Sequence, residues 1–196
     1  MATAMNPSRI FGNWKWGYAL DVHTTSSTYM GVNEFGYEMF DSKRSELGEL
    51  LYRMKYRGDR AAASGIVEAA VAFLERRRNK FDVVVPVPPS GSRPVQPVRI
   101  VANGIGSGLD LPVADCVTTT RSATQLKGVM DLEKRQELLE GLYAVERAHT
   151  RGKSVLLFDD LYRSGATMNA ITELLMTEGR AEVVRVLTIT RTRSRR

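Results

Sequence analysis

The sequence has 196 residues, of which 43% are hydrophobic and 26% charged, and its formal net charge is +6. This length supports one real hydrophobic core, so we expect one α/β domain with an N-terminal addition. No stretch approaches the roughly 20 apolar residues of a membrane span, and residues 1–17 contain no continuous apolar run, so we expect neither a membrane segment nor a signal peptide. The single cysteine, Cys116, excludes a disulfide or a four-cysteine zinc site within the chain and favours a reducing, cytoplasmic setting.

The basic excess has two interpretations. Much of it lies in Glu75–Lys80 and in the tail Arg191–Arg196. It either keeps solvated segments soluble or attracts phosphates, whether of a nucleotide or of nucleic acid. Cys116 lies in a strand-like context with neither histidine near it in sequence, which favours a buried structural thiol over a nucleophile.

The N-terminal third predicts strands followed by helices. Residues 14–40 alternate aromatic and polar side chains between glycines, which favours short antiparallel strands and hairpins. From Ser45 to Arg57 the apolar spacing is helical, with Ser45 as the cap. A second helix is expected over residues 61–78. We therefore divide the chain into an aromatic hairpin or hood segment, 1–44, and a main domain, 45–196.

Strands and helices then alternate to the end of the chain. The β-branched run Val83–Val87 is typical of a strand buried on both faces, and a rigid proline-rich loop follows it. We expect helices over 95–108, 131–140 and 166–179, and strands over 112–120, 153–160 and 182–191. This alternation predicts a mostly parallel sheet with right-handed crossovers, whose ligands bind at the carboxyl ends of the strands.

The stretch "SVLLFDDLYRSGAT", residues 154–167, carries the chemistry. A buried strand ends in Asp159 and Asp160, and a turn containing Gly165 then leads into a helix whose free amides can bind phosphate. Two carboxylates suit the hydroxyls of a vicinal diol, or a divalent cation held indirectly. A simple helix cap would need only one aspartate. The stretch therefore predicts a site for a sugar phosphate.

This stretch resembles the phosphoribosyl-diphosphate signature of type I phosphoribosyltransferases, a strand and two acidic residues before a loop that ends Gly-x-Thr. The resemblance implies that Asp159 and Asp160 bind the ribose hydroxyls and are the catalytic carboxylates. It also implies magnesium, held mainly by diphosphate and ribose oxygens and not directly by protein ligands. The residues expected around the 5-phosphate are Arg163, Ser164, Gly165, Ala166 and Thr167.

Further segments look like the ComF subfamily: "YRMKYRGDRAAA" (52–63), "VVVPVPPSGSR" (83–93) and "TRSATQLKGVMDLEKRQELLEGLYAV" (120–145). The resemblance places a diphosphate loop at "PPSGSR", which otherwise is a rigid proline-rich turn. It places a mobile lid over residues 121–135, where Lys127 and Arg135 are alternatively a solvated helix face. The implied loop residues are Ser90, Gly91, Ser92 and Arg93, and the implied lid residues are Arg121, Gln125, Lys127 and Arg135.

The sequence departs from that subfamily in three places. It has no cysteine-rich zinc module, so its N-terminal hairpin must be held by ordinary packing. The run that follows the first strand reads "RPVQP" (93–97), which puts contacts from that loop in doubt except at Arg93. Arg163 and Ser164 stand where two threonines are usual, and Arg163 either strengthens phosphate binding or points to solvent.

Two functions follow from these observations. The first is an enzyme that binds 5-phosphoribosyl 1-diphosphate with magnesium and transfers the phosphoribosyl group to an unidentified acceptor, releasing diphosphate. The second is a non-catalytic ComF-like module that binds the same ligand or a nucleotide and acts with DNA-processing proteins or single-stranded DNA. For that role Trp14, Trp16 and Tyr18 would stack on bases, although their alternation favours a place in the core. A homodimer is common among proteins of this resemblance.

Overall fold

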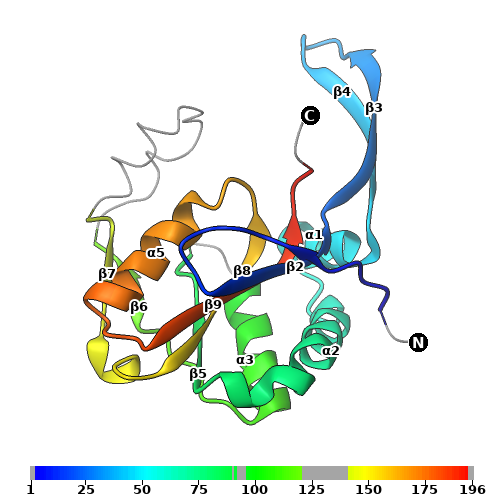
Figure 1. Cartoon of the computed structure of the whole chain (residues 1–196). Coiled ribbons are helices and arrows are strands. Elements are labelled where there is room, and N and C mark those ends of the chain that lie inside the picture. Colours follow the sequence, from blue (N-terminus) through cyan, green and yellow to red (C-terminus); the bar gives the residue numbers. More distant parts are fainter. Residues whose placement is uncertain (1–2, 90, 92–95, 121–140, 194–196) are drawn as a thin grey trace.

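A computed structural model describes residues 3–89, 91, 96–120 and 141–193. Its main sheet has five strands in the order β1-β2-β9-β8-β5 (Figure 1). Every neighbouring pair is parallel except β1 with β2. The strands are β1 (Ser8–Arg9), β2 (Trp16–Val22), β5 (Val83–Pro86), β8 (Ser154–Tyr162) and β9 (Val183–Arg191). The mostly parallel sheet expected from the sequence is confirmed.

Helices cover both faces of this sheet. Leu156 and Phe158 of β8 pack in one core with α1 (Glu46–Arg57), α2 (Ala62–Leu74) and α3 (Pro97–Leu109). Val155 and Leu157 pack in a second core with α5 (Ala166–Thr177). Successive side chains of a strand point to opposite faces, so one unbroken apolar run fills both cores. The two-sided burial expected of residues 83–87 is confirmed in β5, where Val84 lies in the first core and Val83 and Val85 lie in the second.

Local signals set the ends of the helices. Ser45 Oγ accepts a hydrogen bond from the Gly48 amide at 3.0 Å, which caps the start of α1, and Gly58 ends that helix in the left-handed conformation with φ of 63°. The second helix is shorter than predicted. It gives way at Glu75 to the 3₁₀ helix η1 (Glu75–Lys80), whose residues are not buried. The apolar spacing ends at Leu74, so the following charged run places no side chain in the buried core.

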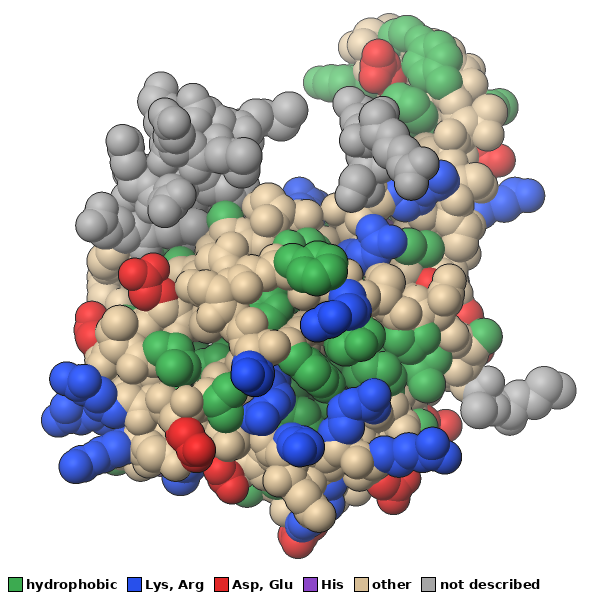
Figure 2. Space-filling model, viewed as in Figure 1, with side chains coloured by type: hydrophobic (Ala, Val, Ile, Leu, Met, Phe, Trp, Pro, Cys, Tyr) green, Lys and Arg blue, Asp and Glu red, His purple; other side chains and the backbone are tan. Residues whose placement is uncertain are grey.

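Part of the basic excess in η1 has structural partners. The Arg77 guanidinium lies 5.1 Å from the centre of the Phe73 ring, and Arg78 donates hydrogen bonds to the C-terminal end of α3. Figure 2, drawn in the view of Figure 1, shows Lys and Arg side chains spread over the lower part of the molecule. Arg78 therefore ties η1 to α3, and Arg77 packs on the end of α2 that precedes it.

The N-terminal third contributes to the main sheet as well as forming a hairpin. β2 pairs with β9 in parallel, which differs from the antiparallel arrangement expected there, and Ala19 and Leu20 of β2 are fully buried. β3 (Thr24–Val32) and β4 (Glu38–Arg44) form the antiparallel hairpin that the sequence predicted, and it projects from the body of the molecule (Figure 1). The division at residues 44 and 45 stays a prediction.

Trp14 belongs to the core. Its side chain is buried, and Nε1 donates a hydrogen bond to the carbonyl of Ile10 at 3.2 Å. Trp16 and Tyr18 pack partly buried against the core on the other face of the sheet. The core role that the alternation favoured is confirmed for Trp14.

The remaining elements form a small layer beside α5. β6 (Val117–Thr119) pairs antiparallel with β7 (Tyr143–Val145), and the 3₁₀ helix η3 (Arg147–His149) leads on toward β8. Cys116 is buried next to β6, as the strand-like context favoured. The helix expected over 131–140 lies outside the described residues. Among the residues that are described, no helix combines the length and apolar character needed to cross a bilayer.

Candidate functional site

The candidate site lies where β8 ends and α5 begins. β8 continues through Leu161 and Tyr162, which pair with Thr190 and Arg191 of β9. The sequence predicted a turn from Leu161 onward, and this was wrong because β9 is long enough to extend the parallel ladder by two residues. The connection to α5 is therefore the short segment Arg163–Gly165.

The two adjacent aspartates point to opposite faces of the sheet, as neighbouring strand residues must. Asp159 lines a small pocket together with residues 161–168 on the α5 side. Asp160 does not line that pocket and instead meets Lys55 of α1. The pair that looks equivalent in sequence thus occupies two different environments.

Asp160 is held from the α1 side. Its Oδ2 lies 2.7 Å from Lys55 Nζ, and the two side chains are only 14% and 16% exposed. The buried Thr190 hydroxyl donates a hydrogen bond to the Asp160 carbonyl at 3.4 Å and lies 3.2 Å from His23 Nδ1. Burial, and then the nearby Lys55 and Arg44 charges, lower the pKa of His23. His23 is therefore a neutral polar neighbour at pH 7, and Lys55 supplies the countercharge.

Burial raises the pKa of Asp159 to about 8, and the negative charge of Asp160 adds to the shift. Two contacts oppose it: the Asp160 amide donates a hydrogen bond to Asp159 Oδ1 at 2.8 Å, and Lys55 is nearby. Thr188 lies beside Asp159 on the adjacent strand, and its buried hydroxyl has no hydrogen-bond partner among the described residues. The Asp159 carboxyl thus takes up or releases its proton near neutral pH.

The loop brings the predicted phosphate residues together. Gly165 is the N-cap of α5 with φ of 83°, and no side chain caps the helix. A Cβ at Gly165 would lie 2.8 Å from the Tyr162 hydroxyl oxygen, so this turn requires glycine. The pocket encloses about 70 Å³ and is lined by Asp159, Leu161, Tyr162, Arg163, Ser164, Gly165, Ala166, Thr167 and Met168.

The arrangement suits a compact anion. Beyond the Ala166 amide, which donates to Ser164, the free amides at the start of α5 and the positive end of the helix dipole attract phosphate. Arg163 and Ser164 are exposed at the rim, and Ser164 Oγ accepts a hydrogen bond from the Ala166 amide at 3.4 Å. Since liquid water occupies about 30 Å³ per molecule, the pocket has room for one small group, and the rest of a larger ligand would lie above it.

N-terminal residues support this loop, which the sequence did not indicate. The Tyr162 hydroxyl donates a hydrogen bond to the Phe11 carbonyl at 3.1 Å, and the Trp14 ring meets the Tyr162 ring edge-on. Asn13 donates two hydrogen bonds to Asn169 of α5, from its amide to Oδ1 at 2.9 Å and from Nδ2 to the carbonyl at 3.0 Å. No local motif marks these residues, because their partners lie about 150 positions away.

Most of the other predicted site residues are not described by the structure. Ser90, Ser92 and Arg93 of the diphosphate loop lie outside the described residues, as do Arg121, Gln125, Lys127 and Arg135 of the lid. Gly91 is described and exposed. The Val87 amide donates a hydrogen bond to the Phe158 carbonyl at 2.9 Å, so the loop that carries Gly91 starts beside Asp159.

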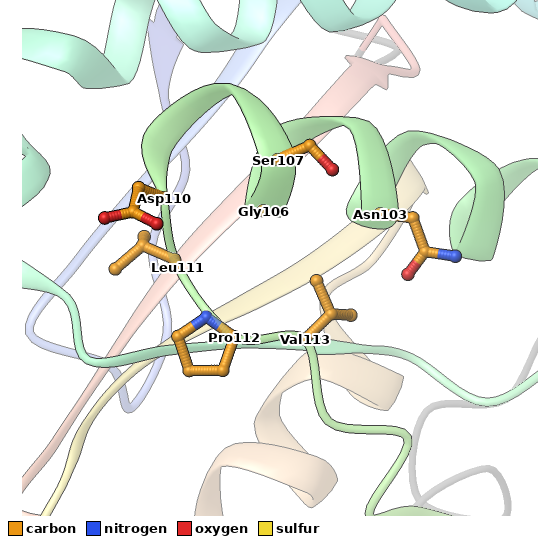
Figure 3. Close-up of a pocket in the computed structure, with 7 residues that line it drawn as sticks. All are labelled: Asn103, Gly106, Ser107, Asp110, Leu111, Pro112 and Val113. Carbon is orange, nitrogen blue, oxygen red and sulfur yellow. The ribbon is translucent and has the colours of Figure 1, made fainter.

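A larger, open hollow of about 480 Å³ lies elsewhere, at the C-terminal end of α3 (Figure 3). Its lining includes Asn103, Ser107 and Asp110 and none of the predicted site residues. Within the described ranges, no group of three or more His, Cys, Asp or Glu side chains is placed to hold a metal ion. The pocket at Asp159 is therefore the hollow that matches the predicted chemistry.

Comparison with known proteins agrees with this geometry. Residues 59–196 match the family model of the phosphoribosyl transferase domain. Competence protein ComFC of Bacillus subtilis is 28% identical over 145 residues, which cover 73% of this chain and 59% of that protein. The chain thus spans less than two thirds of the length of this relative.

Solved structures share the fold at low identity. The allosteric regulatory enzyme of purine biosynthesis superposes with a TM-score of 0.50 and 18% identity over 81% of this chain and 34% of that one. An adenine phosphoribosyltransferase superposes with a TM-score of 0.50 and 14% sequence identity, and the match covers 84% of each chain. A third structure is the Trypanosoma brucei adenine phosphoribosyl transferase in complex with AMP, pyrophosphate and ribose-5-phosphate. It superposes with a TM-score of 0.50 and 13% sequence identity over 94% of this chain and 73% of that one. With a family model matched over most of its length, the chain belongs to the phosphoribosyl transferase domain family; it has the type I fold and is similar to ComFC.

Proposed function

We propose that the chain binds 5-phosphoribosyl 1-diphosphate with magnesium and transfers the phosphoribosyl group to an acceptor, releasing diphosphate. The observation that carries the proposal is the single pocket shared by Asp159 and the uncapped start of α5. A carboxyl group and an anion cradle side by side match a ligand that carries both ribose hydroxyls and a 5-phosphate.

In this proposal the phosphate occupies the loop. The amides at the start of α5 donate to its oxygens, and Ser164 and Thr167 add hydroxyls. Arg163 at the rim adds a positive charge. Glycine at position 165 lets the backbone approach the phosphate closely.

Asp159 and Asp160 bind the ribose and act on the reaction. As the bond to diphosphate breaks, positive charge develops on the ribose ring, and a carboxylate nearby stabilises it. Asp159, with its pKa raised to about 8, accepts the acceptor's proton in its ionised form, so we expect this step to be favoured as the pH rises toward 8. Asp160 reaches the ribose only if its contact with Lys55 changes, so we expect Asp159 to make the larger contribution.

Magnesium fits this donor set as a ligand-held ion. We expect diphosphate and ribose oxygens to coordinate it, with Asp159 contacting its waters, because the described residues form no cage of their own. Magnesium supplies positive charge that offsets the charge of the leaving diphosphate. The residues after Val87 start at the same edge of the sheet, so we expect Ser90, Gly91, Ser92 and Arg93 to bind the diphosphate. Arg121, Gln125 and Lys127 would cover it.

Isothermal titration calorimetry with phosphoribosyl diphosphate, with and without magnesium, tests the binding step. We expect binding by the parent protein and its loss in the double variant Asp159→Asn, Asp160→Asn, with Asp110→Asn, on the exposed C-terminal end of α3, as the matched control. Unchanged binding by the double variant would show that the ligand lies elsewhere. Diphosphate release measured across a panel of nucleobases then separates transfer from binding alone.

The ComFC relative favours a second candidate, a binding module that acts with DNA-processing proteins or single-stranded DNA. The test is binding of single-stranded DNA at increasing salt, with and without residues 193–196. A salt-dependent affinity that weakens on truncation supports this role. Diphosphate release with any acceptor supports the enzyme instead.

A further inference from the structure

The hairpin of β3 and β4 carries the largest gathering of exposed apolar side chains on the described part of the molecule. Of the ten large hydrophobic side chains that are exposed there, seven lie on this hairpin, with exposed fractions from 43 to 74%. Figure 2 shows them gathered at its free end. They are Tyr29, Met30, Val32, Phe35, Tyr37, Met39 and Phe40.

These side chains belong to residues 29–40, which we term the distal half of the hairpin. Two side-chain hydrogen bonds and one ring contact form between residues of this half. The Asn33 side chain accepts hydrogen bonds from the amides of Phe35 and Tyr37, and the rings of Tyr29 and Phe40 lie 5.6 Å apart. Met39 and Phe40 are neighbours on β4 and point to opposite faces, so both faces of the ribbon expose apolar groups.

The stem of the hairpin, in contrast, is anchored. Arg44 pairs with Glu49 of α1 at 3.2 Å and lies over the Tyr52 ring, while Arg193 donates to the carbonyl of Thr25. The distal half is therefore held out from the body as a two-stranded ribbon. An isolated two-stranded hairpin is marginally stable in water, and an exposed apolar patch of this kind marks an interaction surface.

We propose that the distal half is a dimerisation surface that packs against the same hairpin of a second copy of this chain. Its size fits this partner. At these exposed fractions, and at roughly 150–250 Å² for a whole aromatic side chain, its four aromatic residues alone offer about 370–620 Å², and Met30, Val32 and Met39 add to this. A standard interface takes about 800 Å² from each partner.

Charge also favours a second copy, placed antiparallel. The free end of the hairpin carries Glu34 and Glu38, and the stem carries Lys43 and Arg44, with Asp41 between them and Arg44 already paired with Glu49. Two hairpins related by a two-fold axis run in opposite directions, so the acidic end of each meets the basic stem of the other. This arrangement brings Glu38 of each copy toward Lys43 of the other, along a ribbon that is apolar on both faces.

Sedimentation velocity of the full chain at rising protein concentration tests the proposal. We expect a dimer whose dissociation constant rises by more than about tenfold in the double variant Met39→Lys, Phe40→Lys, since two central apolar anchors are lost. Met176→Lys, on α5, is the matched control because Met176 is 41% exposed and Met39 43%. Far-ultraviolet circular dichroism checks that each variant is folded.

A charge exchange tests the antiparallel arrangement. Glu38→Lys alone places like charges together and should weaken the dimer, whereas Glu38→Lys combined with Lys43→Glu should restore it. A parent protein that stays monomeric throughout, or a Met39→Lys, Phe40→Lys variant that dimerises like the parent, overturns the proposal. Neither readout involves phosphoribosyl diphosphate, so the test of the dimer is independent of the proposed activity.

Discussion

Lys55 is the residue whose replacement tests the arrangement of the site most directly. Its ammonium group lies 2.7 Å from Asp160, in a contact where both side chains are about 85% covered. Lys55→Met keeps the length of the side chain but leaves Asp160 without its countercharge, beside a second carboxyl group. Removing one partner of a buried ion pair costs about 3–5 kcal/mol. Because solvent still reaches part of this pair, we expect a loss of about 2–3 kcal/mol from the free energy of unfolding.

Urea unfolding followed by circular dichroism at neutral pH measures this loss. Lys55→Arg should retain most of the stability, and Lys15→Met, at an exposed position, should change it little. The double variant Lys55→Met, Asp160→Asn should recover stability relative to Lys55→Met, because no uncompensated charge remains. If the stability losses of Lys55→Met and of Asp160→Asn, each measured alone, simply add in the double variant, Asp160 does not depend on Lys55 and the reasoning fails.

Three further predictions concern single groups. Because the pKa of Asp159 is raised in the folded protein, the folded state keeps a proton that the unfolded chain releases above about pH 4, so stability falls as the pH rises from about 4 toward 8. Calorimetry should show that Asp159→Asn flattens this fall; a pH dependence equal to that of the parent would contradict it. Gly165→Ala, with its positive φ and the close Tyr162 hydroxyl, should lower the free energy of unfolding by about 1–3 kcal/mol in urea titrations and weaken phosphate binding, and a neutral effect on both would be inconsistent with this turn. Burial raises the pKa of Cys116 to about 11, so iodoacetamide should label it at neutral pH only after unfolding, and rapid native labelling would refute its burial.

The parts of the fold that were predicted correctly have strong local signals. The apolar runs that became β5 and β8 are short and β-branched or aliphatic, and α1 has both a serine cap and a regular apolar spacing. The parallel place of β2 beside β9 was not predictable in this way. Its partner lies about 170 positions later, and an alternating aromatic segment fits a hairpin as well as a sheet strand.

The sequence predicted which residues form the site, and the structure adds the directions in which their side chains point. The loop from Arg163 to Thr167 gathers around one pocket as the pattern indicated. The opposite orientation of Asp159 and Asp160 follows from the two-residue period of a strand and was within reach of the sequence. The contact of Lys55 with Asp160 was not predictable, because no spacing rule links a residue of α1 to one 105 positions away.

The contacts that orient the site come largely from outside the region that the family model matches. That match begins at residue 59, yet the residues that hold the end of β8 precede it. Lys55 fixes Asp160 on one face of the sheet, and Phe11 and Trp14 contact Tyr162 on the other. A site grafted on a shared fold depends on such supports as much as on its signature. The same N-terminal third also carries the exposed hairpin, so in this chain one segment both braces the proposed ribose-phosphate site and presents the surface proposed for a second copy.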